Sequence, residues 1–293
     1  MRVTENIIYS TYIQDILKHQ RSLFKLHEQL ASGKAVNSLS DDPVNAGRIL
    51  RSKSTLSSFD QYERNANSGL TYLNIAESTL ERVKSIIVRA KEVAISEATG
   101  TAGSASRLNA AFEINQLYDE LIALGNKDFQ GSFMFGGYES GTEPFSALGV
   151  YSGDTAEYAI QLGQNKTLAI GINGGKVLKG VGGGVDVIQL VDDLKTALNA
   201  NNTANIQTAI ANMDSSFDQV SLAVSDVGGR ISRLNSTIED IESSKLDVRS
   251  ALSGIEDADI TQVISDLTRR QTALEAAIKS ASRVFSLSIF NYI

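Results

Sequence analysis

The sequence predicts a mainly α protein: an elongated rod of long antiparallel helices, with paired N- and C-terminal arms and a small β-rich insert domain. Three observations predict it. Apolar residues recur at alternating spacings of three and four near both ends of the chain, as on helices that pack together. Only two prolines occur in 293 residues, which permits long uninterrupted helices. Between the helical arms, a glycine-rich stretch alternates apolar and polar residues, as short strands do.

The first region, residues 1–40, is predicted to be the N-terminal helical segment of the rod. Its apolar spacing runs from Ile16 to Leu30 and then meets the tripeptide Ser-Gly-Lys. Gly33 in this tripeptide suits the left-handed position that commonly follows the last turn of a helix. The first helix is therefore expected to end just before Gly33.

The second region, residues 41–135, is predicted to be a helical rod. Ser40, Asp41 or Asp42 is the candidate N-cap of its first helix, and Pro43 suits the first helical position. The stretch ATGTAGSA is predicted to end that helix before another one begins.

The third region, residues 136–185, is predicted to be a small β-rich insert domain between the helical arms. Its segments YAIQL, residues 158–162, and TLAIGI, residues 167–172, are expected to form antiparallel strands joined by a turn at GQN. The stretch NGGKV, residues 173–177, lacks the full pattern of a phosphate-binding loop and is predicted to be a turn.

The last two regions, residues 186–255 and 256–293, are predicted to be a second helical rod and the C-terminal helix. Each carries a seam, meaning a row of residues, mostly apolar, at alternating spacings of three and four. Asp257 and Asp259 lie in the polar break between the seams, where Asp259 can cap the second helix. The first seam is Val227, Ile231, Leu234, Ile238, Ile241, Lys245, Val248, Leu252 and Ile255. The second is Ile260, Ile264, Leu267, Gln271, Leu274, Ile278, Ala281 and Phe285.

Both ends of the chain are apolar, although protein termini are usually polar and frayed. An apolar patch of this kind, with little local core to bury it, marks a partner surface. The candidate assembly residues are Ile7, Ile8, Tyr12 and Ile13 at one end and Phe285, Leu287, Ile289, Phe290, Tyr292 and Ile293 at the other.

Composition and motifs favour a structural role over an enzyme. A formal net charge of −7 argues against nucleic-acid binding, and the lack of cysteine excludes disulfides, zinc–thiolate sites and cysteine nucleophiles. No apolar run is long enough for membrane insertion, and no cleaved signal peptide is expected. The only histidines, His19 and His27, are expected to be a solvent-facing and a seam residue rather than a metal pair. We therefore expect no catalytic residue, metal or cofactor.

Four stretches resemble the bacterial flagellin superfamily: MRVTENIIYS, LHEQLASGKAVNSLSDDPVNAGR, GSFMFGG and IEDADITQVISDLTRRQTALEAAIKSASRVFSLSIFNYI. Within it, three details resemble the hook–filament junction proteins more than flagellins. A proline follows the paired aspartates, the FMFGG turn is present, and the chain ends in IFNYI rather than in a Leu-Leu-Arg type of ending. The matching motif residues are Asp41, Asp42, Pro43, Phe135, Gly136, Gly137, Asp257 and Asp259.

The resemblance implies a subunit of the extracellular flagellum, exported through the flagellar type III apparatus without a cleaved signal. It implies contacts with the hook-associated protein FlgK, with flagellin and with copies of the chain itself in a ring or helical layer. It also implies an export chaperone of the FlgN type. The apolar termini would then pack together in the inner tube of the assembly.

Two alternatives stay open. A short flagellin that forms the filament itself belongs to the same structural class. A secreted coiled-coil adaptor would explain the seams, but it would not explain the apolar ends and the family motifs together.

Overall fold

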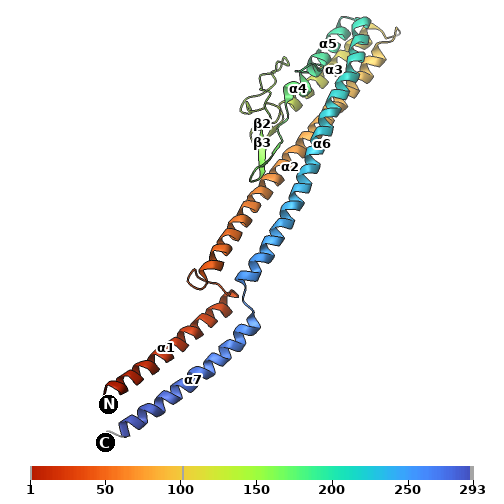
Figure 1. Ribbon diagram of the computed structural model, residues 1–293. Coiled ribbons are helices and arrows are strands. Elements are labelled where there is room, and N and C mark those ends of the chain that lie inside the picture. The colour runs from red at the N-terminus through yellow and green to blue at the C-terminus, as the bar shows by residue number, and fades with distance from the viewer. Residues whose placement is uncertain (1, 101, 291–293) are drawn as a thin grey trace. The chain divides into compact units, whose positions relative to one another are not determined.

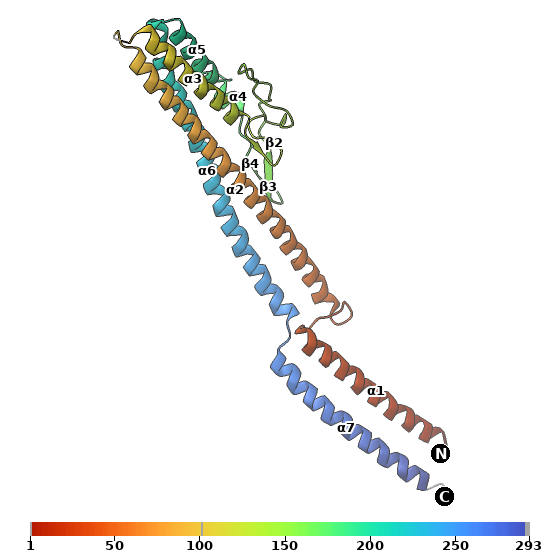
Figure 2. The same cartoon turned by 180° about the vertical axis from the view of Figure 1, so that it is seen from behind.

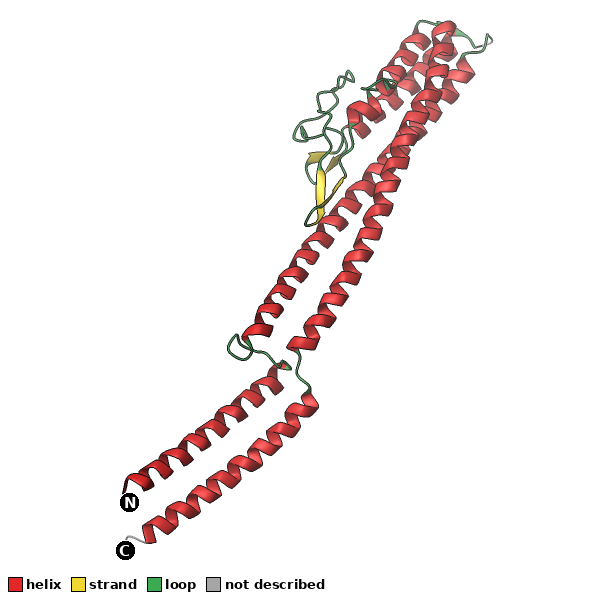
Figure 3. Ribbon diagram, in the orientation of Figure 1, coloured by secondary structure: helices red, strands yellow, loops and turns green. Residues whose placement is uncertain are grey.

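The computed structural model describes residues 2–100 and 102–290; the side chains of residues 2–6, 8 and 284–290 lie outside that description. The mainly α prediction is confirmed, and the strands of the described residues all lie between α3 and α4 (Figures 1 and 3). The helices are α1 (Arg2–Ser32), α2 (Pro43–Glu97), α3 (Ser104–Gly125), α4 (Gly174–Leu178), α5 (Val187–Asn199), α6 (Thr203–Glu256) and α7 (Ile260–Phe290). The strands are β1 (Asp128–Phe129), β2 (Ser132–Phe133), β3 (Ala159–Gly163) and β4 (Lys166–Ala169).

The helix boundaries follow local signals in the sequence. Gly33 takes a φ of +71° directly after α1, as the C-terminal glycine of a helix does. Pro43 begins α2, where its missing N–H costs no hydrogen bond. Asp259 caps α7, because its carboxylate accepts from the backbone N–H groups of Thr261 at 2.9 Å and Gln262 at 3.2 Å.

The chain divides into two compact units, residues 1–58 with 243–293 and residues 59–242. In the second unit, α3 and α5 pack together beside α2 and α6, as both views show (Figures 1 and 2). This unit holds the main apolar core. Its fully buried residues include Leu73, Leu80 and Ile87 of α2, Ile114 and Leu121 of α3, Leu194 and Leu198 of α5, and Leu234 of α6.

The small insert of this unit contains two antiparallel hairpins. The predicted hairpin is confirmed: β3 pairs with β4, with Ile160 opposite Leu168, and a two-residue turn at 164–165. The second strand is shorter than predicted, since it ends at Ala169. A second hairpin, β1 with β2, was not predicted because each of its strands has only two residues.

The prediction of a turn at residues 173–177 was wrong, because this segment begins the one-turn helix α4. Asn173 caps it by accepting from the Lys176 N–H at 3.0 Å. Gly174 and Gly175 are buried, and a Cβ on Gly174 would lie 2.6 Å from the carbonyl oxygen of Phe135. The glycines serve close packing, which a sequence pattern alone does not distinguish from a turn.

In the first unit, α1 and α7 pack antiparallel, with the beginning of α1 beside the end of α7 (Figures 1 and 2). Val263 and Ala281 are buried on α7, and Leu267 and Leu274 are half-buried. The seam of α6 is confirmed in the second unit, where Val227, Leu234 and Ile241 are buried and Ile231 and Ile238 are half-buried. Its continuation in the first unit is half-buried at Lys245, Val248, Leu252 and Ile255.

The seam predicted on α7 is only half correct. Ile260, Ile264 and Ile278 were expected in it, but they are 39%, 48% and 48% exposed. One partner helix covers a narrow stripe of α7, so the residues flanking that stripe stay outside the contact.

Candidate assembly surfaces

The outer face of α1 carries exposed apolar residues. Ile7 is 57% exposed and Ile13 is 52% exposed, whereas Tyr12 is half-buried. Two further residues were not among the candidates, Leu17 and Phe24, of which Phe24 is 73% exposed. Ile13, Leu17 and Phe24 lie four and seven residues apart, which places them on one face of the helix. Extending the helical periodicity along α1 could have found them.

The C-terminal candidates lie largely outside the described residues. The backbone of Phe285, Leu287, Ile289 and Phe290 continues α7, but their side chains are outside the description, as is that of Ile8. Tyr292 and Ile293 fall beyond the described chain altogether. Their role in assembly therefore stays a prediction from sequence.

The paired aspartates that precede α2 have different roles. Asp42 is the N-cap of α2: its Oδ1 accepts from the Val44 N–H at 3.1 Å and the Asn45 N–H at 3.0 Å. These hydrogen bonds hold the pKa of Asp42 below its ordinary value.

Asp41 instead closes the loop that leads into α2. Its carboxylate pairs with Lys25 of α1 at 3.0 Å and accepts from the backbone N–H groups of Asn37 at 3.2 Å and Ser38 at 2.9 Å. The ion pair with Lys25 and the hydrogen bonds from Ser38 lower the pKa of Asp41 to about 2. Both aspartates thus act locally, as helix cap and loop anchor.

The break between α6 and α7 lies against the loop after α1. Lys34 and Asp257 form an isolated antiparallel bridge, and Asp257 accepts a hydrogen bond from the Ser253 hydroxyl at 2.6 Å. Glu256 was not among the residues predicted from sequence, although it is 5% exposed and pairs with Lys34 at 2.7 Å and Lys53 at 2.8 Å. No local pattern marks Glu256, because its partners lie far away in the chain.

The Phe135–Gly136–Gly137 motif is a turn at the base of the insert. Phe135 is fully buried, and its carbonyl accepts from the Tyr151 hydroxyl at 2.9 Å. Gly137 has a φ of +69°, and a Cβ on it would lie 1.8 Å from an oxygen of Asp154. Only glycine fits this position.

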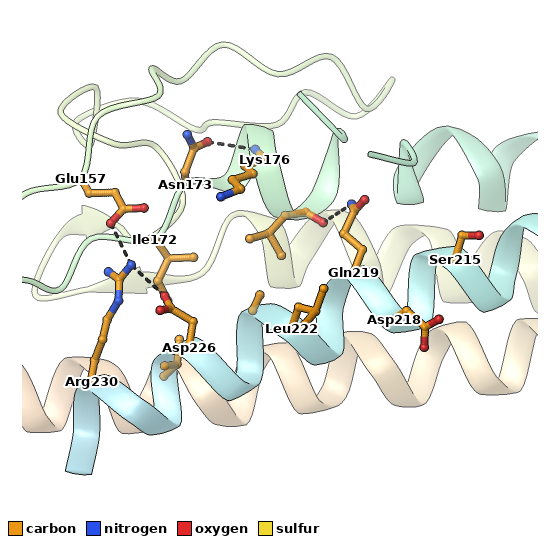
Figure 4. A pocket seen from close by; sticks show the side chains of 13 residues that line it. Glu157, Ile172, Asn173, Lys176, Ser215, Asp218, Gln219, Leu222, Asp226 and Arg230 are labelled. Carbon is orange, nitrogen blue, oxygen red and sulfur yellow. Dashed lines mark hydrogen bonds and ion pairs between the residues drawn. The ribbon is translucent and has the colours of Figure 1, made fainter. Parts of the chain in front are cut away.

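Arg230 of α6 joins the insert to the helix. Its guanidinium donates to the carbonyl oxygens of Ala169 at 3.2 Å and Gly171 at 3.0 Å. It also forms ion pairs with Glu157 at 2.9 Å and Asp226 at 2.8 Å (Figure 4). The contacts with Ala169, Gly171 and Glu157 attach the insert to α6, whereas Asp226 lies on α6 itself.

A cavity with a volume of about 710 Å³ lies beside Arg230. It is lined by α6 and by residues 157–177 of the insert (Figure 4). Two basic side chains line it, Lys176 and Arg230, and Arg230 is already paired with carboxylates; its lining has no histidine. Among the described residues, no group of three or more His, Asp or Glu side chains is placed to hold a metal ion.

The helices of the described residues also include none that combines the length and apolar character needed to cross a membrane. The candidate surfaces consist of an exposed apolar face of α1, two linkers held by hydrogen bonds and ion pairs, and an insert attached through Arg230. Such an arrangement suits contacts between proteins.

Comparison with known proteins gives two family matches. Residues 3–140 match the bacterial flagellin N-terminal helical region, and residues 205–293 match the bacterial flagellin C-terminal helical region. Flagellar hook-associated protein 3 of Salmonella typhimurium is 26% identical over 314 aligned positions, covering 99% of each chain. Flagellin of Bacillus subtilis is 26% identical over 297 positions, covering 94% of each chain.

Solved structures share the fold. The crystal structure of Bacillus cereus FlgL has a TM-score of 0.61 at 17% identity, covering 69% of this chain and 99% of that one. The crystal structure of hook-associated protein 3 from Legionella pneumophila has a TM-score of 0.63 at 15% identity, covering 71% and 98%.

Proposed function

This chain belongs to the bacterial flagellin family, and we propose that it is a structural subunit of the flagellum that forms the junction layer between hook and filament. The observation that carries the proposal is the end-to-end alignment with a flagellar hook-associated protein 3, which covers 99% of both chains. That alignment includes the insert as well as the helical ends. We assign the chain no catalytic role.

The proposed neighbours in this layer are a hook-associated protein of the FlgK type on one side and flagellin on the other. Copies of the chain would pack beside each other in a ring or helical layer. The exposed apolar residues of α1, among them Ile13 and Phe24, support such contacts, because burying them would stabilise an assembly by about 25 cal/mol per Å².

The proposed route to this position is export through the flagellar type III apparatus, without a cleaved signal peptide. A chaperone of the FlgN type would hold the C-terminal helix before export. The apolar C-terminal residues support this, since they would otherwise favour association inside the cell.

The alternative is a short flagellin that forms the filament itself. The 26% identity to Bacillus subtilis flagellin, equal to that of the hook-associated protein, favours keeping it as a second candidate. The two candidates differ in what the cell makes without this chain, so a deletion separates them.

The test is deletion of the gene in its own bacterium, with hooks and filaments counted by electron microscopy and flagellin assayed in the medium. For a junction subunit we expect hooks without filaments and flagellin monomers in the medium. Loss of the major filament protein with no leaked monomer would identify a flagellin instead. Intact filaments and normal swimming would contradict both candidates, and a plasmid copy of the gene provides the control.

A further inference from the structure

A second cavity of the unit 59–242 lies between α2 and the two hairpins of the insert, and its volume is about 380 Å³. The insert is held against α2 on both sides of this cleft (Figure 3). The Asn65 side chain of α2 donates to the Gln161 carbonyl of β3 at 2.9 Å. The Tyr72 hydroxyl of α2 donates to the Met134 carbonyl, just after β2, at 2.8 Å. The cleft therefore has walls fixed by hydrogen bonds.

Five aromatic side chains line the cleft, and they come from separate segments of the chain. They are Tyr72 of α2, Phe129 and Phe133 of the β1–β2 hairpin, Tyr138 after the Phe-Gly-Gly turn, and Tyr158 just before β3. Tyr72 lies edge-to-face with Phe129 at a centroid distance of 5.8 Å and with Tyr158 at 5.3 Å. Tyr72 is 3% exposed and forms the floor, whereas Tyr138 is 67% exposed. Rings held in this way offer a ligand flat apolar surfaces whose faces carry a partial negative charge.

Polar side chains without charge complete the lining. They are Ser68, Gln130, Ser132 and Ser140. Within the described chain, none of these four side chains forms a hydrogen bond with another residue. Their hydroxyl and amide groups can both donate and accept, so they are available to a ligand that does the same.

The described residues that line this cleft include no Asp, Glu, Lys, Arg or His, although 21% of the chain is charged. The cavity beside Arg230 and the grooves lined by Lys25 and by Glu81 are charged, by comparison. Burial raises the pKa of the Tyr72 and Tyr158 hydroxyls, so these groups stay neutral as well. A charged ligand would lose its hydration here without gaining a counter-charge.

The backbone is strained at one lining residue. Gln130 has a φ of +53° and is followed by Gly131 with a φ of +82°, in the two-residue turn between β1 and β2. Asparagine and glycine suit such a turn, whereas glutamine adopts a positive φ only at a cost. Strain of this kind is typical of residues that hold a ligand.

We propose that this cleft binds a neutral oligosaccharide. The C–H bonds on one face of a sugar ring pack against aromatic rings, and the hydroxyls at its edge exchange hydrogen bonds with serine and glutamine side chains. A wholly apolar ligand would instead remove water from those polar groups and leave them unpaired. Ligand pockets range over about 300–1,000 Å³, so a cleft at the lower end suits about one or two sugar rings. The proposal is independent of the flagellar layer that the chain forms.

The test is isothermal titration calorimetry of the purified full-length chain with maltohexaose, cellohexaose and chitohexaose, which are all neutral. We expect saturable binding of at least one of them at millimolar concentration. Tyr138→Ala should weaken this binding about tenfold, the loss expected for one aromatic ring. Phe112→Ala is the matched control, because Phe112 lies on α3 outside the cleft and is also 67% exposed. No binding of any of the three sugars, or equal affinities in the two variants, would overturn the proposal.

A second variant separates binding from folding. Gln130→Gly removes the amide and the strain together, because glycine adopts a φ of +53° freely. We expect about fivefold weaker binding from the lost hydrogen bonds, with a thermal unfolding midpoint that is unchanged or higher. Gln130→Asn keeps an amide and should recover part of the affinity. Full affinity in Gln130→Gly would contradict a role of this residue in the site.

Two further probes test the chemistry of the ligand. Poly-L-proline represents a proline-rich peptide, which also packs on aromatic rings but needs an extended groove. An oligogalacturonate represents an anionic sugar. We expect both to bind more weakly than the best neutral sugar. Tighter binding of either one would overturn the assignment to a neutral oligosaccharide.

Discussion

At the scale of single residues, the adjacent aspartates Asp41 and Asp42 have different roles because they bind different partners. Asp42 faces the free N–H groups at the start of α2, so it acts as the helix cap. Asp41 faces Lys25 and the backbone of its own loop. The sequence alone did not show whether Ser40, Asp41 or Asp42 caps α2. The hydrogen bonds of each side chain decide it.

Asp41 should carry an acid-sensitive contribution to stability. Its pKa in the folded chain is about 2, below the ordinary 3.8, so the contribution is present above the unfolded pKa and is lost as the pH falls from about 4 towards 2. We expect Lys25→Met to raise the pKa of Asp41, measured by NMR titration of its carboxyl carbon. An unchanged titration in Lys25→Met would show that the loop hydrogen bonds alone hold the charge.

Gly137 should be intolerant of any side chain. Gly137→Ala places a Cβ against the Asp154 carboxylate and forces alanine to a φ of +69°, so we expect a loss of more than about 1 kcal/mol in the free energy of unfolding. Gly141→Ala is the matched control, because its Cβ meets nothing within 4 Å. Urea denaturation followed by circular dichroism measures both. Equal midpoints for the two variants would contradict the strain argument.

At the scale of elements, the helices are stabilised mainly by apolar stripes that other helices cover. The buried share of the stripe differs from helix to helix. The stripe of α6 meets the core of the second unit, where its residues are buried or half-buried. The stripe of α7 has only α1 beside it in the described chain and remains partly exposed. The periodicity of a seam predicts that a helix packs, but the number of its neighbours decides how much of the seam is covered.

Two adjacent glycines interrupt the middle of α6, where they weaken a helix. A Cβ on Gly229 would meet nothing within 4 Å, so we expect Gly229→Ala to stabilise the chain by about 0.5–1 kcal/mol. Gly174→Ala should have the opposite sign, since its Cβ would lie 2.6 Å from the Phe135 carbonyl oxygen. Thermal unfolding compares the two variants. A destabilised Gly229→Ala would mean that this backbone needs glycine for a reason other than space.

At the scale of the whole molecule, the chain combines a well-packed unit, residues 59–242, with a unit that carries both apolar ends. An isolated chain has no reason to expose Ile7, Ile13 and Phe24, because their burial would lower its free energy. A subunit that buries these side chains only on assembly does have a reason to expose them beforehand.

Truncation of residues 285–293 should separate folding from assembly. We expect the shortened chain to keep its helical circular dichroism signal and cooperative unfolding, because the main core lies within residues 66–234. Expressed in the deletion strain, it should leave hooks bare and flagellin in the medium. The full-length chain in the same vector is the control. Normal filaments with the truncated chain would refute an assembly role for this end.

By itself, the sequence determined the features that depend on neighbours along the chain. The end of α1 before Gly33, the start of α2 at Pro43, the cap at Asp259 and the β3–β4 hairpin arise from hydrogen bonds and backbone preferences that span a few residues, so local patterns located them. The same stretches were enough to indicate the flagellin family, which the two family matches then bore out.

Only the tertiary structure decided the contacts between distant parts of the chain. Lys53 and Glu256 are 203 residues apart, and Arg230 reaches the insert carbonyls from about 60 residues away. It also decided which face of α7 is covered and that the glycines after Asn173 pack closely instead of forming a turn. The physical reason is that a buried charge or a close backbone approach is stable only when its partner is present, and no local pattern specifies a partner that the fold brings from far along the chain.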